Sequence, residues 1–126
     1  MKTPTPDELL NEILVRDPRY TVEAYAFVRT GLDFTVRRLD KPRHVSGQEL
    51  LVGIRAIALE EFGPMAKTVL NGWGIKRTED VGEIVFNLVE TGLLGKTEKD
   101  NRADFANGYD FDEAFRKPYK PAPVRS

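Results

Sequence analysis

Four segments of this chain carry apolar residues at intervals of three or four positions, the spacing of one face of an α-helix. The longest segment runs from about Thr21 to Leu39, and it contains Val22, Tyr25, Val28, Leu32, Val36 and Leu39. Shorter stripes occupy residues 9–14, 50–62 and 81–89. A chain patterned in this way is expected to fold into a mainly helical structure.

Residues that favour the start or the end of a helix lie at the ends of the same segments. Thr5 and Ser46 each precede a Glu by three positions, which is the pattern of a capping box, and Thr78 precedes two acids that suit a first turn. Prolines and glycines follow the stripes as stop signals. Gly31 lies inside the second stripe, where it is either required for a close helix crossing or simply tolerated. The predicted helices are residues 5–17, 21–39, 46–62, 64–72 and 78–91.

The C-terminal third predicts a small β-hairpin and a tail. Asn107-Gly108 is a favoured hairpin turn, so a hairpin is expected over residues 93–111. Residues 116–126 contain three prolines, four basic residues and no acid, which is typical of a flexible basic tail. A chain of 126 residues has the length of one domain. We therefore expect one helical domain with a C-terminal hairpin over residues 1–115, and a flexible tail over residues 116–126.

The order of helices, short turn, helix and hairpin from residue 46 onwards is that of a winged helix, so the fold class is mainly α with a winged-helix-like order. Such folds often read DNA through Lys and Arg on their third helix. Here no Lys or Arg occurs from Glu79 to Leu94, and residues 78–115 hold three basic against ten acidic residues. The predicted recognition surface would therefore repel phosphates.

Composition argues against several function classes. The net charge is −1, there is no cysteine, and His44 is the only histidine. This inventory excludes disulfides and thiolate chemistry, disfavours zinc sites, and offers no convincing nucleophilic triad. The N-terminus has no apolar signal region and no stretch approaches the length of a membrane span. We expect a cytoplasmic protein that is not an enzyme, binds no cofactor or metal, and has no membrane partner.

Aromatic and acidic residues interleave between residues 104 and 115. Such a segment suits docking on a basic protein surface, but the same rings would also suit folding back over the helices. Trp73, between two glycines, is either a plug over a helix junction or an anchor for a partner. The leading hypothesis is a non-catalytic binding module for an unidentified protein, with an interface formed by Trp73, Phe105, Tyr109, Asp110, Phe111 and Phe115.

Basic residues are concentrated between residues 29 and 43. The second hypothesis is a nucleic-acid-associated protein, either a winged-helix-like regulator or a ribosome-associated factor, that uses Arg29, Arg37, Arg38, Lys41 and Arg43. The same residues also fit a solvated helix end, where cations complement the negative end of the dipole. The oligomeric state is left open, because an apolar helix face can dimerise without a mark in the sequence.

Three stretches carry a resemblance that covers most of the chain: "DPRYTVEAYAFV", "RHVSGQELLVGIRAIALEEFGPMAKTVL" and "EDVGEIVFNLVETGLLGKTEKD" with its later "YDFDEAF". Together they resemble a family of small conserved hypothetical proteins of planctomycetes and verrucomicrobia that is uncharacterised. The resemblance implies a bacterial cytoplasmic origin. It implies no catalytic residues and no cofactor.

Overall fold

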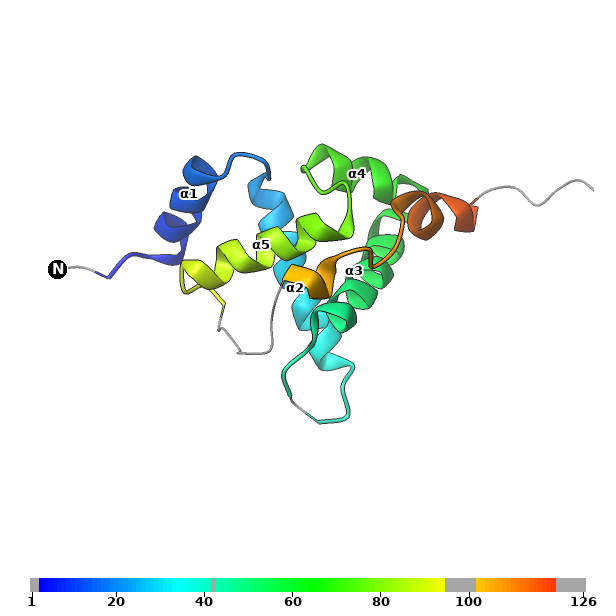
Figure 1. The fold of residues 1–126 in the computed structure, drawn as a ribbon, viewed down its shortest axis with the longest axis horizontal. Helices are drawn as coiled ribbons and strands as arrows, with labels where there is room; N and C mark the ends of the chain where they lie inside the picture. Colours follow the sequence, from blue (N-terminus) through cyan, green and yellow to red (C-terminus); the bar gives the residue numbers. More distant parts are fainter. Residues whose placement is uncertain (1–2, 42, 95–101, 120–126) are drawn as a thin grey trace, which may run out of the picture.

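The computed structural model describes residues 3–41, 43–94 and 102–119, and within these ranges the regular structure is entirely helical (Figure 1). Its α-helices are α1 (Pro6–Arg16), α2 (Val22–Arg37), α3 (Gly47–Phe62), α4 (Ala66–Gly72) and α5 (Thr78–Glu90). A single helical turn, η1 (Gly63–Met65), joins α3 to α4. Three more turns come after α5: η2 (Arg102–Phe105), η3 (Asp112–Arg116) and η4 (Lys117–Tyr119). The predicted helical class is confirmed. Across the described ranges, no helix is both long and apolar enough to span a bilayer.

Three of the predicted helix starts are confirmed by their caps. The Thr5 hydroxyl accepts a hydrogen bond from the amide of Glu8 at 3.2 Å, and Thr21 caps α2 in the same way. At α3 the amide of Glu49 donates to Ser46 Oγ at 3.1 Å, and the Ser46 amide donates to Glu49 Oε1 at 3.1 Å. Each cap satisfies an amide that the helix leaves unpaired and is typically worth about 1 kcal/mol.

The start of α5 differs from the prediction, because Thr78 does not cap it. The N-cap is Arg77, and the carboxylate of Asp80 accepts from the amides of Lys76 at 2.9 Å and Arg77 at 3.2 Å. Thr78 is instead fully buried. Its hydroxyl is thereby available for contacts with the C-terminal segment.

The core lies between α2, α3 and α5, with α5 crossing the other two (Figure 1). Helix α1 packs on α5, while α4 packs on α3 at the opposite end of the molecule. Each α-helix contributes a fully buried side chain to one contiguous core, for example Ile13, Val28, Ile54, Leu70 and Ile84. The stripes predicted from the sequence are therefore largely the faces that leave water, which is the main source of stability, and Val22 at the start of the α2 stripe is an exception that stays exposed.

Helices α2 and α3 cross at two glycines. A Cβ built on Gly31 would overlap Cδ1 of Ile54, and one built on Gly53 would overlap Oγ1 of Thr35. The Thr35 hydroxyl is buried and donates to the carbonyl of Gly31 at 2.7 Å. Of the two interpretations of Gly31, the structure supports the close crossing.

The predicted hairpin is not seen in the described part of residues 93–111, and a wing is not shown. The chain does turn at Asn107, whose φ is 52°, but both flanks are helical turns, η2 and η3. The reason is burial: η2 and η3 each turn apolar side chains toward the helices, which two short, poorly alternating strands could not do. Residues 95–101, the remainder of the predicted hairpin, lie outside the described residues.

The predicted basic tail falls mostly outside the described residues. Its first four residues, from Arg116 to Tyr119, complete η3 and form η4. Residues 120–126 are not described. The boundary expected at residue 115 is thus followed by at least one further helical turn.

Candidate functional site

Three aromatic residues predicted to dock a partner lie in the core. Phe105 is 2% exposed, Phe111 4% and Phe115 0%. The Phe111 and Phe115 rings meet edge to face with centroids 5.0 Å apart, and Phe105 packs on Phe86 at 6.3 Å. Of the two interpretations of this segment, the structure shows the one in which the rings fold back over the helices. These three side chains present no exposed surface to a partner.

Tyr109 and Asp110 also serve the packing of this segment. The Tyr109 hydroxyl donates to the carbonyl of Leu51 at 2.9 Å, and burial raises the pKa of this phenol above its usual range. The Asp110 carboxylate is exposed and accepts from the amide of Glu113 at 3.2 Å. Asp110 is therefore the one member of the predicted interface in this segment that is fully exposed, and it already caps the next turn.

Thr78 holds the C-terminal segment against α5. Its hydroxyl donates to the carbonyl of Phe105 at 2.7 Å and accepts from the amide of Gly108 at 3.0 Å. The same oxygen thus satisfies two backbone groups on either side of the turn at Asn107. This buried anchor explains why the segment is part of the domain.

Trp73 lies at the junction of α2, α3 and α4. Its ring is half-buried and packs on Phe27 and Phe62, with centroids 5.6 Å away in both cases. Its carbonyl accepts from the amide of Thr21 at 3.2 Å, which ties the start of α2 to the end of α4. Trp73 therefore packs over the helix junction, which is one of its two predicted roles, and it remains partly exposed at the surface.

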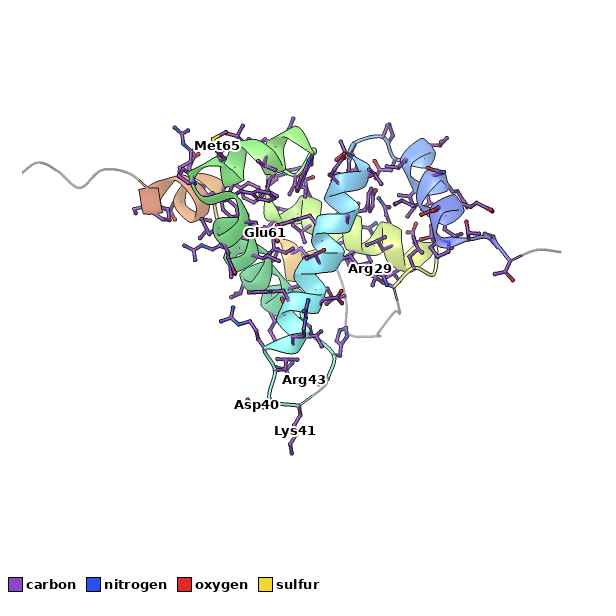
Figure 2. The ribbon with its side chains drawn as sticks, turned by 180° about the vertical axis from the view of Figure 1, so that it is seen from behind. Arg29, Asp40, Lys41, Arg43, Glu61 and Met65 are labelled. Carbon is purple, nitrogen blue, oxygen red and sulfur yellow. The ribbon has the colours of Figure 1, made fainter. Side chains whose placement is uncertain are left out.

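Two exposed apolar side chains adjoin this aromatic cluster along the chain. Met65 follows Phe62 in the next turn and is 55% exposed, and Val22 follows Thr21 and is 43% exposed. Figure 2 shows Met65 at the edge of the face on which α2 and α3 lie in front. Exposed side chains of this kind beside partly buried rings are typical of the centre of a protein interface.

An open hollow of about 360 Å³ runs between α2 and α3 below this cluster. Arg37 and Arg38 line it from α2, and Glu60 and Glu61 line it from α3 (Figure 2 labels Glu61). Phe34 lies between them, and the Arg38 guanidinium carbon is 5.1 Å from its ring centroid. We call the surface made by this hollow and the Trp73 cluster the α2–α3 face; its members are Val22, Phe34, Arg37, Arg38, Glu60, Glu61, Phe62, Met65 and Trp73.

The five basic residues predicted to bind nucleic acid do not form one patch. Arg29 lies away from the tip of the molecule that carries Lys41 and Arg43 (Figure 2), and it donates to the carbonyl of Leu93 at 2.9 Å. Arg43 forms two short hydrogen bonds with Glu49, at 2.9 and 2.6 Å. The hydrogen bond from Arg43 lowers the pKa of Glu49 to about 2. Arg37 and Arg38, as described above, share their hollow with two carboxylates.

A cluster of hydrogen-bonded polar side chains joins the turn between α1 and α2 to α5. Arg19 donates to both carboxylate oxygens of Asp17, at 2.8 and 2.7 Å, and this contact holds the pKa of Asp17 well below its usual range. Asn87 donates to Asp17 at 2.9 Å and to the buried hydroxyl of Tyr25 at 3.0 Å. Every group in this cluster has a partner, so it reads as a structural network. Within the described ranges no three His, Cys, Asp or Glu side chains are grouped to hold a metal ion.

Sequence reasoning assigned Arg37, Arg38 and Trp73 to candidate sites and missed the other six members of this face: Val22, Phe34, Glu60, Glu61, Phe62 and Met65. Their only sequence signal is helical phase: Phe34 and Arg38 lie four residues apart, and Ile57 and Glu61 lie four apart on the next helix. That signal says which residues share a helix face. It does not say that the two faces meet, which depends on the crossing at Gly31 and Gly53.

Comparison of the chain with protein-family models, with curated proteins and with solved structures finds no match in any of the three. Inferences about function therefore rest on the geometry described above.

Proposed function

We propose that this protein is a non-catalytic binding module that acts through protein contacts, and that the α2–α3 face is its contact surface. The observation that carries the proposal is the partly exposed Trp73, whose ring packs on Phe27 and Phe62, with exposed Met65 and Val22 next to this cluster along the chain. Burying such a group against a partner removes apolar area from water at about 25 cal/mol per Å².

The makeup of this face supports a protein partner. Protein interfaces combine a well-packed aromatic centre with a polar, charged rim, and Trp, Met and Arg are enriched in them. The α2–α3 face has Trp73 and Met65 at one end and Arg37 and Arg38 at the other. Because Phe27 and Phe62 fix the Trp73 ring, little side-chain freedom would be lost on binding.

The proposal replaces the aromatic segment at residues 104–115 as the interface. The rings of that segment are buried, and exposing them would require the hydrogen bonds of Thr78 and Tyr109 to break. Trp73 is the one predicted interface residue that keeps its place in the new surface.

Site-specific photo-cross-linking tests this surface. A photo-reactive amino acid is placed at Met65 in the full chain, or at Val15 as the matched control, because Val15 is 85% exposed and lies on α1, which contributes no residue to this face. Cross-linking is carried out in cells that express the protein, and cross-linked peptides are identified by mass spectrometry. We expect a defined protein adduct from position 65 and none from position 15. Equal labelling from both positions, or from neither, would refute the proposal.

A surface variant provides an independent check. Met65→Lys changes an exposed side chain, so the free energy of unfolding should shift by no more than about 0.5 kcal/mol. With the photo-reactive residue moved to Val22, the Met65→Lys variant should lose the adduct while its thermal unfolding is unchanged. An adduct that persists at full yield would show that this end of the face makes no contact.

The alternative is nucleic-acid association. It is supported by one observation: Arg29, Arg37, Arg38 and Lys41 form no ion pair with any residue in the described ranges. It predicts binding to duplex DNA or RNA that weakens steeply with salt, and a shallower salt slope once Arg37 and Arg38 become Ala. A nuclease-sensitive adduct from position 65, or salt-dependent duplex binding with this change of slope, would favour it over the protein module.

A further inference from the structure

We infer that the partner on the α2–α3 face is a second copy of this chain, related by a two-fold axis that runs along the hollow, parallel to its two walls. This inference rests on the function proposed above and names its partner. The hollow carries an arrangement of charge that a single chain leaves incomplete.

The hollow has a cationic wall and an anionic wall that do not pair with each other. Arg37 uses its Nε to donate to the carbonyl of Asp33 at 3.3 Å, and Arg38 stacks on Phe34. Glu60 and Glu61 are exposed and make no hydrogen bond or ion pair with the described residues. Two cations and two carboxylates thus line the same hollow, and each remains hydrated.

This arrangement selects among partners by charge. A polyanion would meet Glu60 and Glu61, and a polycation would meet Arg37 and Arg38, so each would gain attraction on one wall and repulsion on the other. A surface of zero net charge with the two signs on opposite sides complements the hollow on both walls. The chain itself carries such a surface.

Two-fold symmetry converts the arrangement into a matched interface. In an isologous contact, residue i of one copy meets residue j of the other, and residue j meets residue i. An axis along the hollow places the α2 wall of each copy over the α3 wall of its partner. Arg37 and Arg38 then face Glu60 and Glu61 twice.

Apolar side chains contribute to the same contact. Phe34 is half-buried and Ile57 is buried, and both line the hollow together with the exposed Thr30, so the contact would cover apolar surface as well as the charges. The Trp73 cluster extends this surface at one end. Complementary charges fix orientation and exclude wrong partners more than they add affinity.

Charge reversal of each wall tests the pairing. One variant carries Arg37→Glu and Arg38→Glu, and the other carries Glu60→Lys and Glu61→Lys. Sedimentation velocity of the full chain is measured from about 1 µM to about 1 mM, the range of weak to moderate association. We expect the unchanged protein to form dimers, and each variant to dimerise at least about tenfold more weakly because like charges meet across the axis.

Mixing the two variants is the decisive measurement. In a heterodimer the glutamates at 37 and 38 face the lysines at 60 and 61, while the native arginines of one chain face the native glutamates of the other. Both sets of contacts are then attractive, so the mixture should form a heterodimer that neither variant forms alone. Only folded chains can restore association, so the mixture also checks that the variants fold.

Matched controls carry the same change in net charge elsewhere. Lys41→Glu with Lys117→Glu controls the first variant, and Glu12→Lys with Glu113→Lys controls the second. All four positions are exposed, and none lies on the α2–α3 face. These controls should dimerise as the unchanged protein does, and should gain nothing when mixed.

The outcomes separate this inference from the proposed function. An unchanged protein that stays monomeric at every concentration refutes self-association, and the binding module stands if position 65 still cross-links to a different protein. Dimers that all four variants form equally well place the interface elsewhere. Folded wall variants that fail to associate on mixing refute the two-fold pairing. Absence of both dimers and adducts refutes both proposals.

Discussion

Gly82→Ala is expected to loosen the C-terminal segment from α5. A Cβ at Gly82 would lie 2.8 Å from Cγ and 2.9 Å from Cβ of Phe105. These atoms form the root of the side chain, so the ring cannot swing away without moving the backbone that Thr78 holds. The overlap must therefore be relieved by shifting the whole η2 turn.

The size of the effect follows from two opposing contributions. Overpacking a core costs about 1–3 kcal/mol, and expelling the Phe105 ring altogether would cost about 3–5 kcal/mol. Replacing Gly by Ala inside a helix gains about 1 kcal/mol. After this gain is subtracted, we expect the free energy of unfolding to fall by up to about 2 kcal/mol if the η2 turn shifts, and by about 2–4 kcal/mol if the ring is expelled, measured by urea denaturation monitored by circular dichroism.

A double-mutant cycle isolates the overlap from the helix effect. In a Phe105→Ala background Cγ and the ring are absent and only the Cβ contact at 2.9 Å remains, so Gly82→Ala should destabilise that background less than it destabilises the unchanged protein. Gly72→Ala is a second control, since a Cβ at Gly72 meets nothing within 4 Å. If Gly82→Ala has the same effect with and without the Phe105 ring, the packing of η2 on α5 is not as described.

Two other changes probe the buried polar contacts. Thr78→Val keeps the shape of the side chain but leaves the Phe105 carbonyl and the Gly108 amide unpaired. The free energy of unfolding should therefore fall by about 2–4 kcal/mol. Equal urea midpoints for the variant and the unchanged protein would contradict this. Asp17 has a folded pKa below its ordinary value of 3.8, so its contribution is complete above about pH 4 and is lost as pH falls through the folded value. Asp17→Asn should therefore lower the free energy of unfolding by about 1–2 kcal/mol at pH 7, because the amide bonds Arg19 more weakly than the carboxylate does. The variant should also lose less stability than the unchanged protein between pH 4 and pH 2. An unchanged dependence on pH in this range would show that Asp17 is not the source of the acid destabilisation.

Most of the helical fold was predictable because helix signals are local. The capping contacts at Thr5, Thr21 and Ser46 each span three residues, and the stripe on α2 repeats within four. Such contacts form wherever the residues stand in that order, so reading them needs no knowledge of the rest of the chain.

The candidate site was not predictable in the same way, because its contacts are long-range. Whether Phe105 docks on a partner or on α5 depends on the absence of a side chain at Gly82 and on the hydroxyl of Thr78, 27 residues earlier in the chain. The aromatic and acidic pattern alone fitted both outcomes. The same holds for Trp73, whose ring packs on Phe27 and Phe62 as a plug, while its role as a partner anchor stays a prediction.

The sequence by itself determined that the chain as far as α5 is helical, roughly where those helices begin and end, and most of the faces they bury. Only the tertiary structure decided what those faces meet. Arg37 and Arg38 looked like part of a basic stretch, and the crossing of α2 and α3 at Gly31 and Gly53 sets them opposite Glu60 and Glu61. The physical reason is that backbone hydrogen bonding and capping act over a few residues, whereas packing and the charge of a surface are set by segments distant in the chain.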